Sequence, residues 1–514
     1  MLGDANLSEL LYKYLYLAVT IVVILSGSVT VDYYQRISRF LRILGYVLIV
    51  LFIPLDVLFM GILSALSYPF LLLLGIIGLF VTLYCEGYSR VLLGLARTLQ
   101  LPLDIFMISL LLLYSSSILI EFVMFWIITE LIGFMIILSE GTRGAWNAAI
   151  QYLIVGALTA DFSLFTLLAI ISYNVGLDKA LVYTFSELAS LNIGAGVILT
   201  ILLSLGFIAK AALVPLHFWL PDAYTLAPSP ASAILSGVME KMSIYGILRI
   251  LRIIRLNELV LVYILVGLGV TTAIYAAAQA LIQRDIKRLL SYSTMAYSGI
   301  LMSMIGVYVY AGFMQEILQA IYALMIAHGL SKSLLFVNAG SIELLANTRD
   351  IYDLGYLSRI DEVGSQTITI GVMSLLGVPS TIGFVGKTIA IIALIKASLM
   401  GEIFAIPVLI ALIFLSASGI IYGLKYLSTY YGGYKTSPGK ILKYYILNVS
   451  EKTGALLNIV LGIIIPLPFM GFNTVTIVVT LINVIGILGI SLTYMILKHS
   501  TTRIEEPWLG GARP

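Results

Sequence analysis

The segment LGFIAKAALVPLHFWLPDA, residues 205–223, interrupts a long apolar run with a charged residue and two helix breakers. Lys210 lies inside the apolar run, and Pro215 and Pro221 end it. A helix break at membrane depth leaves backbone groups without hydrogen-bond partners, so it is tolerated only where protein or a water-filled cavity supplies them. The segment therefore predicts a broken transmembrane helix with a lysine at the interruption.

A second segment, LLGVPSTIGFVGK at residues 375–387, repeats this combination. Pro379 and glycines interrupt its apolar run, and Lys387 follows the interruption. Interrupted helices in corresponding positions of two halves indicate internal repeats with a translocation site at each break. The alternative is that Pro and Gly only kink crowded helices. Two breaks that each carry a lysine favour transport.

The whole chain has the composition of a membrane protein. Of its 514 residues, 61% are hydrophobic and 11% are charged, whereas soluble globular proteins carry roughly 25% charged residues. Its apolar runs predict an all-α polytopic membrane protein with about 14–15 transmembrane helices, because a run of about 18 to 25 residues crosses the hydrocarbon core. The expected ranges are 8–31, 43–64, 66–84, 101–118, 120–138, 148–172, 193–215, 228–251, 258–282, 290–310, 315–345, 365–396, 402–424, 454–471 and 473–497.

The positions of Lys and Arg predict the orientation of the chain. Most of them fall in loops that share one side of the membrane when the chain has fifteen helices: 32–42, 85–100, 139–147, 283–289, 346–364 and 425–453. By the positive-inside rule this side is the cytoplasm. We therefore expect the N-terminus outside and the C-terminus in the cytoplasm. The first apolar segment lacks a basic region before it, so we expect an anchor rather than a cleaved signal peptide.

The remaining composition argues against cofactors and nucleic acid. The 29 basic and 26 acidic residues give a net charge of only +3, too balanced to suggest a nucleic-acid partner. Three histidines and one cysteine, Cys85, are too few for a zinc site or an iron–sulfur cluster. We expect no cofactor and no metal on this chain, so any redox centre lies on another chain.

Glu130 is the acidic residue most in need of a partner. It lies in the middle of the predicted helix FWIITELIGFM, residues 125–135, with no basic residue within reach on that helix. A carboxyl group there must be protonated or meet a cation from elsewhere, and Lys210 is the obvious candidate. Such a pair would act as a proton switch, or it would be a static buried ion pair that joins two helices.

Further ionisable residues lie between and after the two breaks. Lys241 is placed as a relay between two half-channels, and Glu240 points about 100° away on an α-helix, so the two cannot face one groove. Glu240 is then either a second titrating site or a packing partner for another helix. His328 and Lys332 are four residues apart and share a helical face, which favours a proton relay over a satisfied core histidine.

Four further ionisable residues lie in or beside the predicted helices. His217 follows the first break, where it would either carry protons into the cavity or cap exposed carbonyl groups. Lys396, at the end of its span, is expected to extend to the membrane interface. Asp56 and Asp161 have no visible partner in the sequence.

Several stretches together resemble the antiporter-like family. This family comprises the proton-pumping membrane-arm subunits of respiratory complex I, the large subunits of Mrp-type cation/proton antiporters and related subunits of membrane-bound group 4 hydrogenases. The similarity runs in order from about Glu130 to about Lys387, and the wording SPASAILSGVM resembles the Mrp and hydrogenase branch somewhat more. The stretches are GFIAKAALVPLHFWLPDAYTLAPSPASAILSGVMEKMSIYGILR, ALIQRDIKRLLSYSTMAYSG, AHGLSKSLLFVNAGSI and LGVPSTIGFVGK.

The resemblance implies roles for the first members of a proton pathway. Glu130 matches the family's fifth-helix glutamate and Lys210 its seventh-helix lysine, an ion pair whose opening drives proton exchange at the lysine. Lys241 matches the eighth-helix lysine. His328 and Lys332 match the relay of the eleventh helix.

The resemblance also covers the far end of the pathway. Lys387 matches the twelfth-helix residue that delivers the proton to the other side. His217 matches the histidine after the seventh-helix break, and Asp285 with Lys287 matches a loop motif that is structural. The family usually has an apolar residue where this chain has Glu240, so the surroundings of the central lysine differ.

The family fold implies the division of the chain. It consists of two inverted five-helix repeats, helices four to eight and nine to thirteen. This gives N-terminal helices at 1–100, the first repeat at 101–255, the second, inverted repeat at 256–432, and C-terminal helices with a short cytoplasmic tail at 433–514.

The sequence thus predicts an ion-translocating subunit of a redox-driven membrane complex. It would move H⁺, or Na⁺, along a central axis in the plasma membrane without itself catalysing redox chemistry. Its partners would be other membrane subunits, including further antiporter-like ones, peripheral redox subunits and lipid. The alternatives are a subunit of an Mrp-type Na⁺/H⁺ antiporter without a redox partner, and a helical scaffold whose buried charges only stabilise the bundle.

Overall fold

The computed structural model describes residues 4–61, 63–355, 357–432, 445–465 and 474–499. The predicted tail at 500–514 and Lys435, Lys440 and Lys443 of the predicted loop 425–453 lie outside the described residues. Among the described residues, eleven helices are long and apolar enough to cross a membrane. The prediction of an all-α polytopic membrane protein is confirmed, and each predicted span overlaps a helix.

Long helices form the body of the molecule. They are α1 (Asp4–Val29), α2 (Gln35–Leu55), α3 (Tyr68–Leu93), α4 (Arg97–Tyr114), α5 (Leu119–Leu138), α7 (Leu158–Val175), α10 (Val197–Lys210), α13 (Met242–Ile253), α14 (Glu258–Ile282), α15 (Ile286–Tyr310), α16 (Gln315–Ala346), α17 (Glu362–Leu376), α18 (Ile382–Leu399), α19 (Ala405–Tyr431), α20 (Tyr445–Ile464) and α22 (Thr474–His499).

Shorter elements connect or extend these helices. They are α6 (Arg143–Gln151), α8 (Leu177–Val182), α9 (Phe185–Ser190), α11 (Trp219–Leu226), α12 (Ser229–Gly237), the π-helical turns η1 (Asp56–Met60) and η2 (Tyr152–Ala157), and the 3₁₀ turns η3 (Met239–Lys241), η4 (Ile351–Asp353) and η5 (Leu357–Arg359). The strands β1 (Ile193–Gly194) and β2 (Ile254–Arg255) pair in parallel, with Ile193 opposite Ile254.

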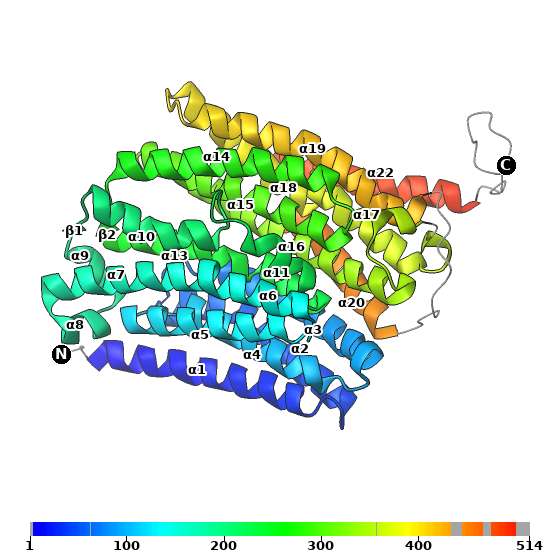
Figure 1. The fold of residues 1–514 in the computed structure, drawn as a ribbon, viewed down its shortest axis with the longest axis horizontal. Helices are drawn as coiled ribbons and strands as arrows, with labels where there is room; N and C mark the ends of the chain where they lie inside the picture. The colour runs from blue at the N-terminus through cyan, green and yellow to red at the C-terminus, as the bar shows by residue number, and fades with distance from the viewer. Residues whose placement is uncertain (1–3, 62, 356, 433–444, 466–473, 500–514) are drawn as a thin grey trace.

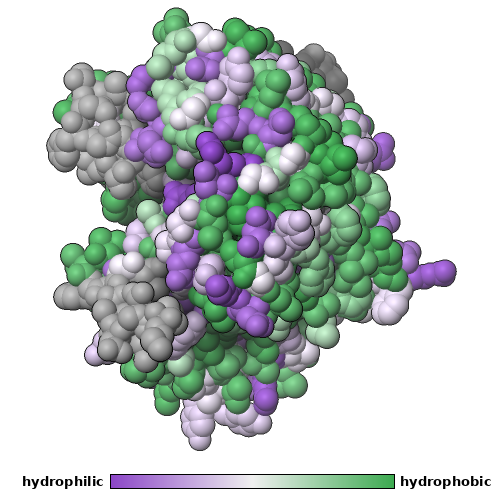
Figure 2. Space-filling view, turned by 90° about the vertical axis from the view of Figure 1, so that its left-hand side faces the viewer, coloured by the Kyte–Doolittle hydropathy of each residue, from purple (hydrophilic) through white to green (hydrophobic). Residues whose placement is uncertain are grey.

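The long helices run side by side along one direction (Figure 1). Helix α1 begins at the left-hand end of the bundle and α22 reaches the right-hand end, as an odd number of crossings requires. Seen along the bundle, hydrophilic residues gather on the end face and hydrophobic residues dominate its flank (Figure 2). This distribution suits a bundle whose sides face lipid and whose ends face water.

Two helices form the centre of the bundle. The apolar stretch of α16 is completely buried, and that of α3 is 83% buried. Helix α3 packs against α12, α16 and α20, so the N-terminal helices belong to the same core as the central ones. A helix buried on all sides has no lipid-facing surface, so each of its polar residues must find a partner inside the protein.

Two of the predicted loops are largely helical, which corrects the sequence analysis. Helix α2 begins at Gln35 and α3 continues to Leu93. Arg42, predicted in a loop, is fully buried, and its Nη2 lies 2.6 Å from Oε2 of Glu86. The predicted spans end where charged residues appear in the sequence. The helices α2 and α3 continue past these positions because their charged residues pair with each other across the contact between the two helices.

Candidate functional site

The first broken helix carries a buried ion pair. Lys210 is the last residue of α10, and its Nζ lies 3.0 Å from Oε1 of Glu130 on α5. Both side chains are at most 1% exposed. The ammonium also donates to the hydroxyl of Tyr152, 3.1 Å away, and lies 4.7 Å from the centre of that ring. The pairing predicted from the isolation of Glu130 is confirmed.

The local backbone explains why the lysine lies here. A helix C-terminus has free carbonyl groups and a partial negative charge, which favour a cation in the last turn. Residues 211–218 then form the break, where the amide of Val214 donates to Thr272 Oγ1 at 2.9 Å and Trp219 Nε1 donates to the carbonyl of Ala209 at 2.9 Å. Other helices therefore supply the partners that a break at membrane depth requires.

A second carboxyl group lies beside this pair. Asp161 on α7, half-buried, is within interaction range of both Glu130 and Lys210. Helices α7 and α10 approach closely because Gly206 has no side chain: a Cβ there would lie 2.5 Å from the Cα of Ala160. The sequence left Asp161 without a partner. The structure places Asp161 near the Glu130–Lys210 pair, and Glu130 is the carboxylate that pairs with the ammonium.

A second cluster surrounds Lys241, at the end of the 3₁₀ turn η3. Its Nζ lies 3.0 Å from Nδ1 of His328 on α16 and contacts the carboxylate of Glu240. The other carboxylate oxygen of Glu240 accepts a hydrogen bond from Ser298 on α15. The prediction that Glu240 and Lys241 face different directions was wrong, because it assumed an uninterrupted α-helix, whereas the segment changes to a tighter turn at these residues.

A close helix approach brings Lys241 to His328. A Cβ on Gly237 of α12 would lie 3.1 Å from the carbonyl of Gly329, and a Cβ on Gly329 would lie 2.7 Å from the carbonyl of Gly237. The two helices can meet only because both positions lack a side chain. The imidazole of His328 also stacks on the ring of Tyr297, with centroids 4.4 Å apart.

The remaining two lysines donate to main-chain carbonyl groups. Lys332 Nζ lies 3.0 Å from the carbonyl oxygen of Leu290, and Lys387 Nζ lies 3.0 Å from that of Leu376. Leu376 is the last residue of α17, so Lys387 caps the second broken helix. The predicted relay partners His328 and Lys332 therefore bond to different groups.

A small cavity lies between His328 and Lys387. Its lining also includes Tyr297, Ser331, Ser374 and Gly383. Ser331 and Ser374 are hydrogen bonded at 2.7 Å, and the amide of Gly383 at the second break lies 3.3 Å from Ser374 Oγ. Hydroxyl groups and a free space of this kind suit ordered water. The second break thus opens onto a small cavity whose lining combines a histidine, a lysine and two serines with apolar side chains such as Leu324 and Leu375.

The other predicted residues have structural partners. His217 is partly buried, with Nδ1 3.3 Å from the carbonyl of Pro215, as expected for a residue that caps the break. Asp56 accepts from the amide of Leu63 at 3.1 Å. Asp285 caps α15 by accepting from the amides of Lys287 and Arg288.

Sequence reasoning missed several polar residues of the interior. Tyr152 and Ser298 are hidden among the many tyrosines and serines of the chain, and only their contacts with Lys210 and Glu240 single them out. Glu451 on α20 lies inside the predicted loop 425–453, yet it is helical and only 2% exposed. In the described part of the chain, no group of three His, Cys, Asp or Glu side chains is placed to hold a metal ion.

Comparisons with known sequences identify relatives of the chain. Residues 116–414 match the family model described as NADH:quinone oxidoreductase/Mrp antiporter, TM. An uncharacterised protein of Mycobacterium tuberculosis is 30% identical over 338 residues, which are 64% of this chain and 52% of that protein. NADH-quinone oxidoreductase subunit M of Rickettsia conorii is 28% identical over 317 residues, 61% of this chain and 60% of that protein.

A further relative and a solved structure extend the comparison. Hydrogenase-4 component B of Escherichia coli is 28% identical over 334 residues, 63% of this chain and 49% of that protein. The chain thus spans between 49% and 60% of the length of these relatives. A chain from the structure of the membrane-bound sulfane sulfur reductase, an archaeal respiratory membrane complex, superposes with a TM-score of 0.70 at 20% identity, over 88% of this chain and 95% of that chain. This likeness shows the fold.

Proposed function

This chain belongs to the NADH:quinone oxidoreductase/Mrp antiporter transmembrane family, and on that premise we propose that it is an ion-translocating, antiporter-like subunit of a redox-driven membrane complex. Protons move along an axis of buried side chains, from Glu130 and Lys210 through Lys241, His328 and Lys332 to Lys387. The chain contributes ion transfer, and the redox chemistry belongs to partner subunits.

The observation that carries this proposal is the Glu130–Lys210 ion pair at the first helix break, 3.0 Å long and closed to solvent. A charged group inside a membrane protein is costly, and such groups mark ion pathways or proton relays. While Glu130 lies close, it holds the ammonium in its charged form. When the carboxylate is neutralised or moves away, the lysine releases its proton more readily. Asp161 lies near the pair and offers a second carboxylate, which can accept the proton that Lys210 releases or attract the Lys210 ammonium.

The rest of the axis supplies acceptors for the released proton. Lys241 contacts a carboxylate on one side and His328 on the other, so a proton can pass from the glutamate–lysine pair to an imidazole. The cavity beyond His328 leads to Lys387. Moving one charge across 100 mV corresponds to about 2.3 kcal/mol, and opening a buried ion pair is an event of comparable size.

The relatives' names indicate the kind of assembly. They name a subunit of an NADH-quinone oxidoreductase and a component of a hydrogenase. We therefore propose that this chain lies in the plasma membrane beside other membrane subunits, including further antiporter-like ones, with peripheral redox subunits attached. Its N-terminus lies outside and its C-terminus in the cytoplasm, as the distribution of Lys and Arg favours.

The test uses the complete complex in sealed liposomes. Proton uptake driven by the redox reaction is followed with a pH-sensitive dye, for the unmodified complex and for the Glu130→Gln and Lys210→Ala variants. Both variants are expected to assemble and to lose proton uptake. Unchanged uptake in both variants would mean that the buried pair is a scaffold contact, and the proposal would be wrong.

A second candidate is a subunit of an Mrp-type Na⁺/H⁺ antiporter, which the matched family model also includes. The subunits that copurify with the chain separate the two candidates. Flavin, iron–sulfur or nickel subunits would exclude the antiporter. Uptake of ²²Na⁺ driven by an imposed pH gradient, in a complex without such subunits, would exclude the redox-driven assembly.

A further inference from the structure

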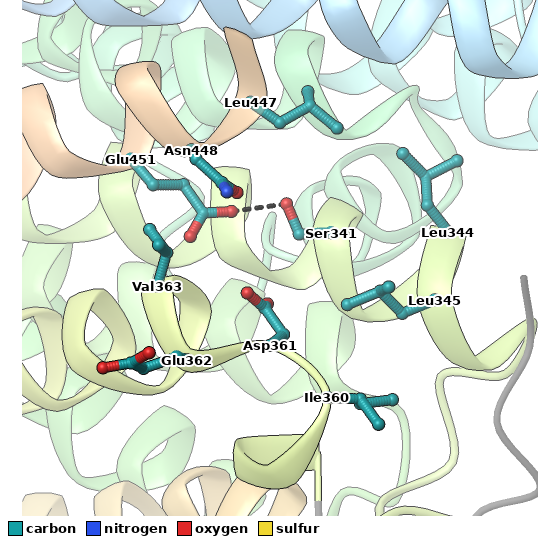
Figure 3. Close-up of a pocket in the computed structure, with 10 residues that line it drawn as sticks. All are labelled: Ser341, Leu344, Leu345, Ile360, Asp361, Glu362, Val363, Leu447, Asn448 and Glu451. Atoms are coloured by element: carbon teal, nitrogen blue, oxygen red, sulfur yellow. Dashed lines mark hydrogen bonds between the residues drawn. The ribbon is translucent and has the colours of Figure 1, made fainter. Parts of the chain in front are cut away.

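A surface pocket lies where α16 ends and where α17 and α20 begin. Figure 3 shows its lining, which includes Ser341, Asp361, Glu362, Asn448 and Glu451. Glu362 is exposed, whereas Glu451 is only 2% exposed. The Asp361 carboxylate points toward Ser341, and Glu362 points away (Figure 3). The pocket therefore connects a charged surface with a buried carboxyl group.

Glu451 is the centre of a hydrogen-bonded layer. Its carboxylate accepts from Ser341 of α16 and from Thr367 of α17, the latter at 2.7 Å. Asn338 of α16 joins this layer through the carbonyl of Gly364, which lies 3.4 Å from Asn338 Nδ2 and 3.2 Å from Thr367 Oγ1. From Asn338 the contacts lead back to the surface through Tyr430, whose hydroxyl lies 3.3 Å from Asn338 Nδ2 and donates to Asp361 at 2.9 Å. Because Glu451 and its donor Ser341 themselves line the pocket, this carboxyl group can exchange protons with water there.

A second polar layer lies deeper between the same three helices. It consists of Ser331, Ser374 and Asn458, with Ser331 Oγ 2.7 Å from Ser374 Oγ and 3.4 Å from Asn458 Oδ1. Two of its members, Ser331 and Ser374, line the cavity that also contains His328 and Lys387. The deeper layer is therefore part of the proposed proton axis.

The two layers are in register on all three helices. Asn338 and Ser331 are seven residues apart on α16, Thr367 and Ser374 on α17, and Glu451 and Asn458 on α20. Seven residues are two helical turns, so the layers are separated by about 10 Å along the helices. Helix α16 runs opposite to the other two, and the order of its two polar residues is reversed accordingly.

The space between the layers is apolar and narrow. At the midpoint α17 and α20 present glycines, and α16 presents Leu334, which is fully buried. A Cβ on Gly454 would lie 3.1 Å from Leu334 Cδ1, and a Cβ on Gly371 would lie 3.4 Å from Leu334 Cδ2. Leu334 thus lies against both glycine positions, together with Leu335 at Gly371 and Phe80 at Gly454.

We infer that α16, α17 and α20 form a proton inlet from the pocket at Glu451 to the cavity beside His328 and Lys387, with Leu334 as the barrier between the two polar layers. Hydronium in the pocket protonates the Glu451 carboxylate and leaves as water. When Leu334 moves, the Glu451 carboxyl group releases this proton through water to the deeper layer and then to the neutral amine of Lys387, which becomes an ammonium. Helix α20 lies beyond residues 116–414, which match the family model, so the inlet uses an element outside the matched region. This inference rests on the proposed function.

The first test replaces the buried carboxyl group and a matched surface one. Glu451→Gln and Glu362→Gln each remove one carboxylate from the pocket, but only the first interrupts the inlet. With uptake divided by the amount of intact complex, Glu451→Gln is expected to lower proton uptake by about tenfold or more, as for loss of a proton-transfer group. Glu362→Gln is expected to leave it unchanged.

The second test concerns the barrier. Leu334→Ser places a hydroxyl group between the two polar layers and is expected to raise passive proton leak in resting liposomes. Thr369 lies on the same helix but outside both layers and donates to the carbonyl of Ser365 at 2.7 Å, so Thr369→Val is expected to retain uptake per intact complex. Equal losses in Thr369→Val and Glu451→Gln would indicate a packing role and overturn the inlet, as would a Leu334→Ser variant without added leak.

The outcomes separate the inlet from the proposed function. If the unmodified complex pumps and Lys210→Ala abolishes pumping, the proposed function stands. Proton uptake at the unmodified rate in Glu451→Gln would then overturn the inlet alone. A Glu451→Gln variant that loses ²²Na⁺ uptake but retains proton uptake would likewise overturn the inlet as a proton route. If the unmodified complex moves no ion, both proposals fail.

Discussion

The two broken helices hold their lysines in different ways. At the first break, Lys210 pairs with the carboxylate of Glu130 at 3.0 Å. At the second, Lys387 donates to the main-chain carbonyl of Leu376 at 3.0 Å, and within the described residues it forms no ion pair. The distances are the same and both side chains are buried, so the difference lies in the charge of the partner.

That difference determines what each lysine can do. A carboxylate interacts strongly with an ammonium and weakly with a neutral amine, so the first partner favours the charged lysine. A carbonyl oxygen accepts a hydrogen bond from either form, because a neutral amine still has N–H groups. Lys387 can therefore lose its proton without losing its partner. The first break suits a switch that holds charge, and the second suits a site that exchanges protons with the cavity beside it.

The largest expected effect comes from removing each lysine in turn. Lys210→Met leaves the buried Glu130 without its cation, which costs about 3–5 kcal/mol when one member of a buried pair is lost. Lys387→Met leaves one carbonyl unsatisfied, a cost of about 1–3 kcal/mol. The thermal stability of the purified complex should therefore fall further in Lys210→Met. Equal losses would contradict the distinction between the two breaks.

A double-mutant cycle measures the same distinction with a smaller expected effect. Adding Glu130→Gln to Lys210→Met removes the unpaired charge, so the double variant should be more stable than Lys210→Met alone, with a coupling energy of about 0.5–3 kcal/mol. Adding Glu130→Gln to Lys387→Met should give additive losses, since these residues belong to different breaks. Thermal unfolding of the three single and two double variants, beside the unmodified complex, provides the measurement. Coupling in the second pair would mean that the two breaks are energetically linked in the resting state.

The sequence predicted those parts of the site in which a charged residue has no partner of opposite charge on its own helix. Glu130 has no cation on its own helix, so a partner had to come from another helix, and Lys210 is that partner. The breaks at Pro215 and Pro379 were predictable because proline cannot continue a helix in either place. The all-α fold followed from the lengths of the apolar runs in the same direct way.

The predictions that were wrong, and the residues that were missed, depend on how separate segments meet in space, which no single stretch of sequence indicates. Glu240 and Lys241 contact each other only because an α-helical segment tightens to a 3₁₀ turn there. Arg42 looked like a loop residue because its partner, Glu86, lies on a separate helix. The layers at Glu451 and Asn458 need three helices in register, and no one segment contains that information.

The smallest effect is expected at Lys396, whose ammonium lies 2.5 Å from Glu316. This is the same kind of ion pair as at the first break, but its side chains are 52% and 47% exposed. Water competes for both charges, so Lys396→Ala should cost about 0–1 kcal/mol and leave proton uptake unchanged. Thermal unfolding and dye-based uptake check the two expectations, and high salt should erase the small stability difference. A loss of stability in Lys396→Ala as large as that in Lys210→Met would show that the presence of an ion pair alone sets the cost of removing a lysine. A negligible loss would show that a carboxylate partner makes a lysine important for stability only where both groups are buried.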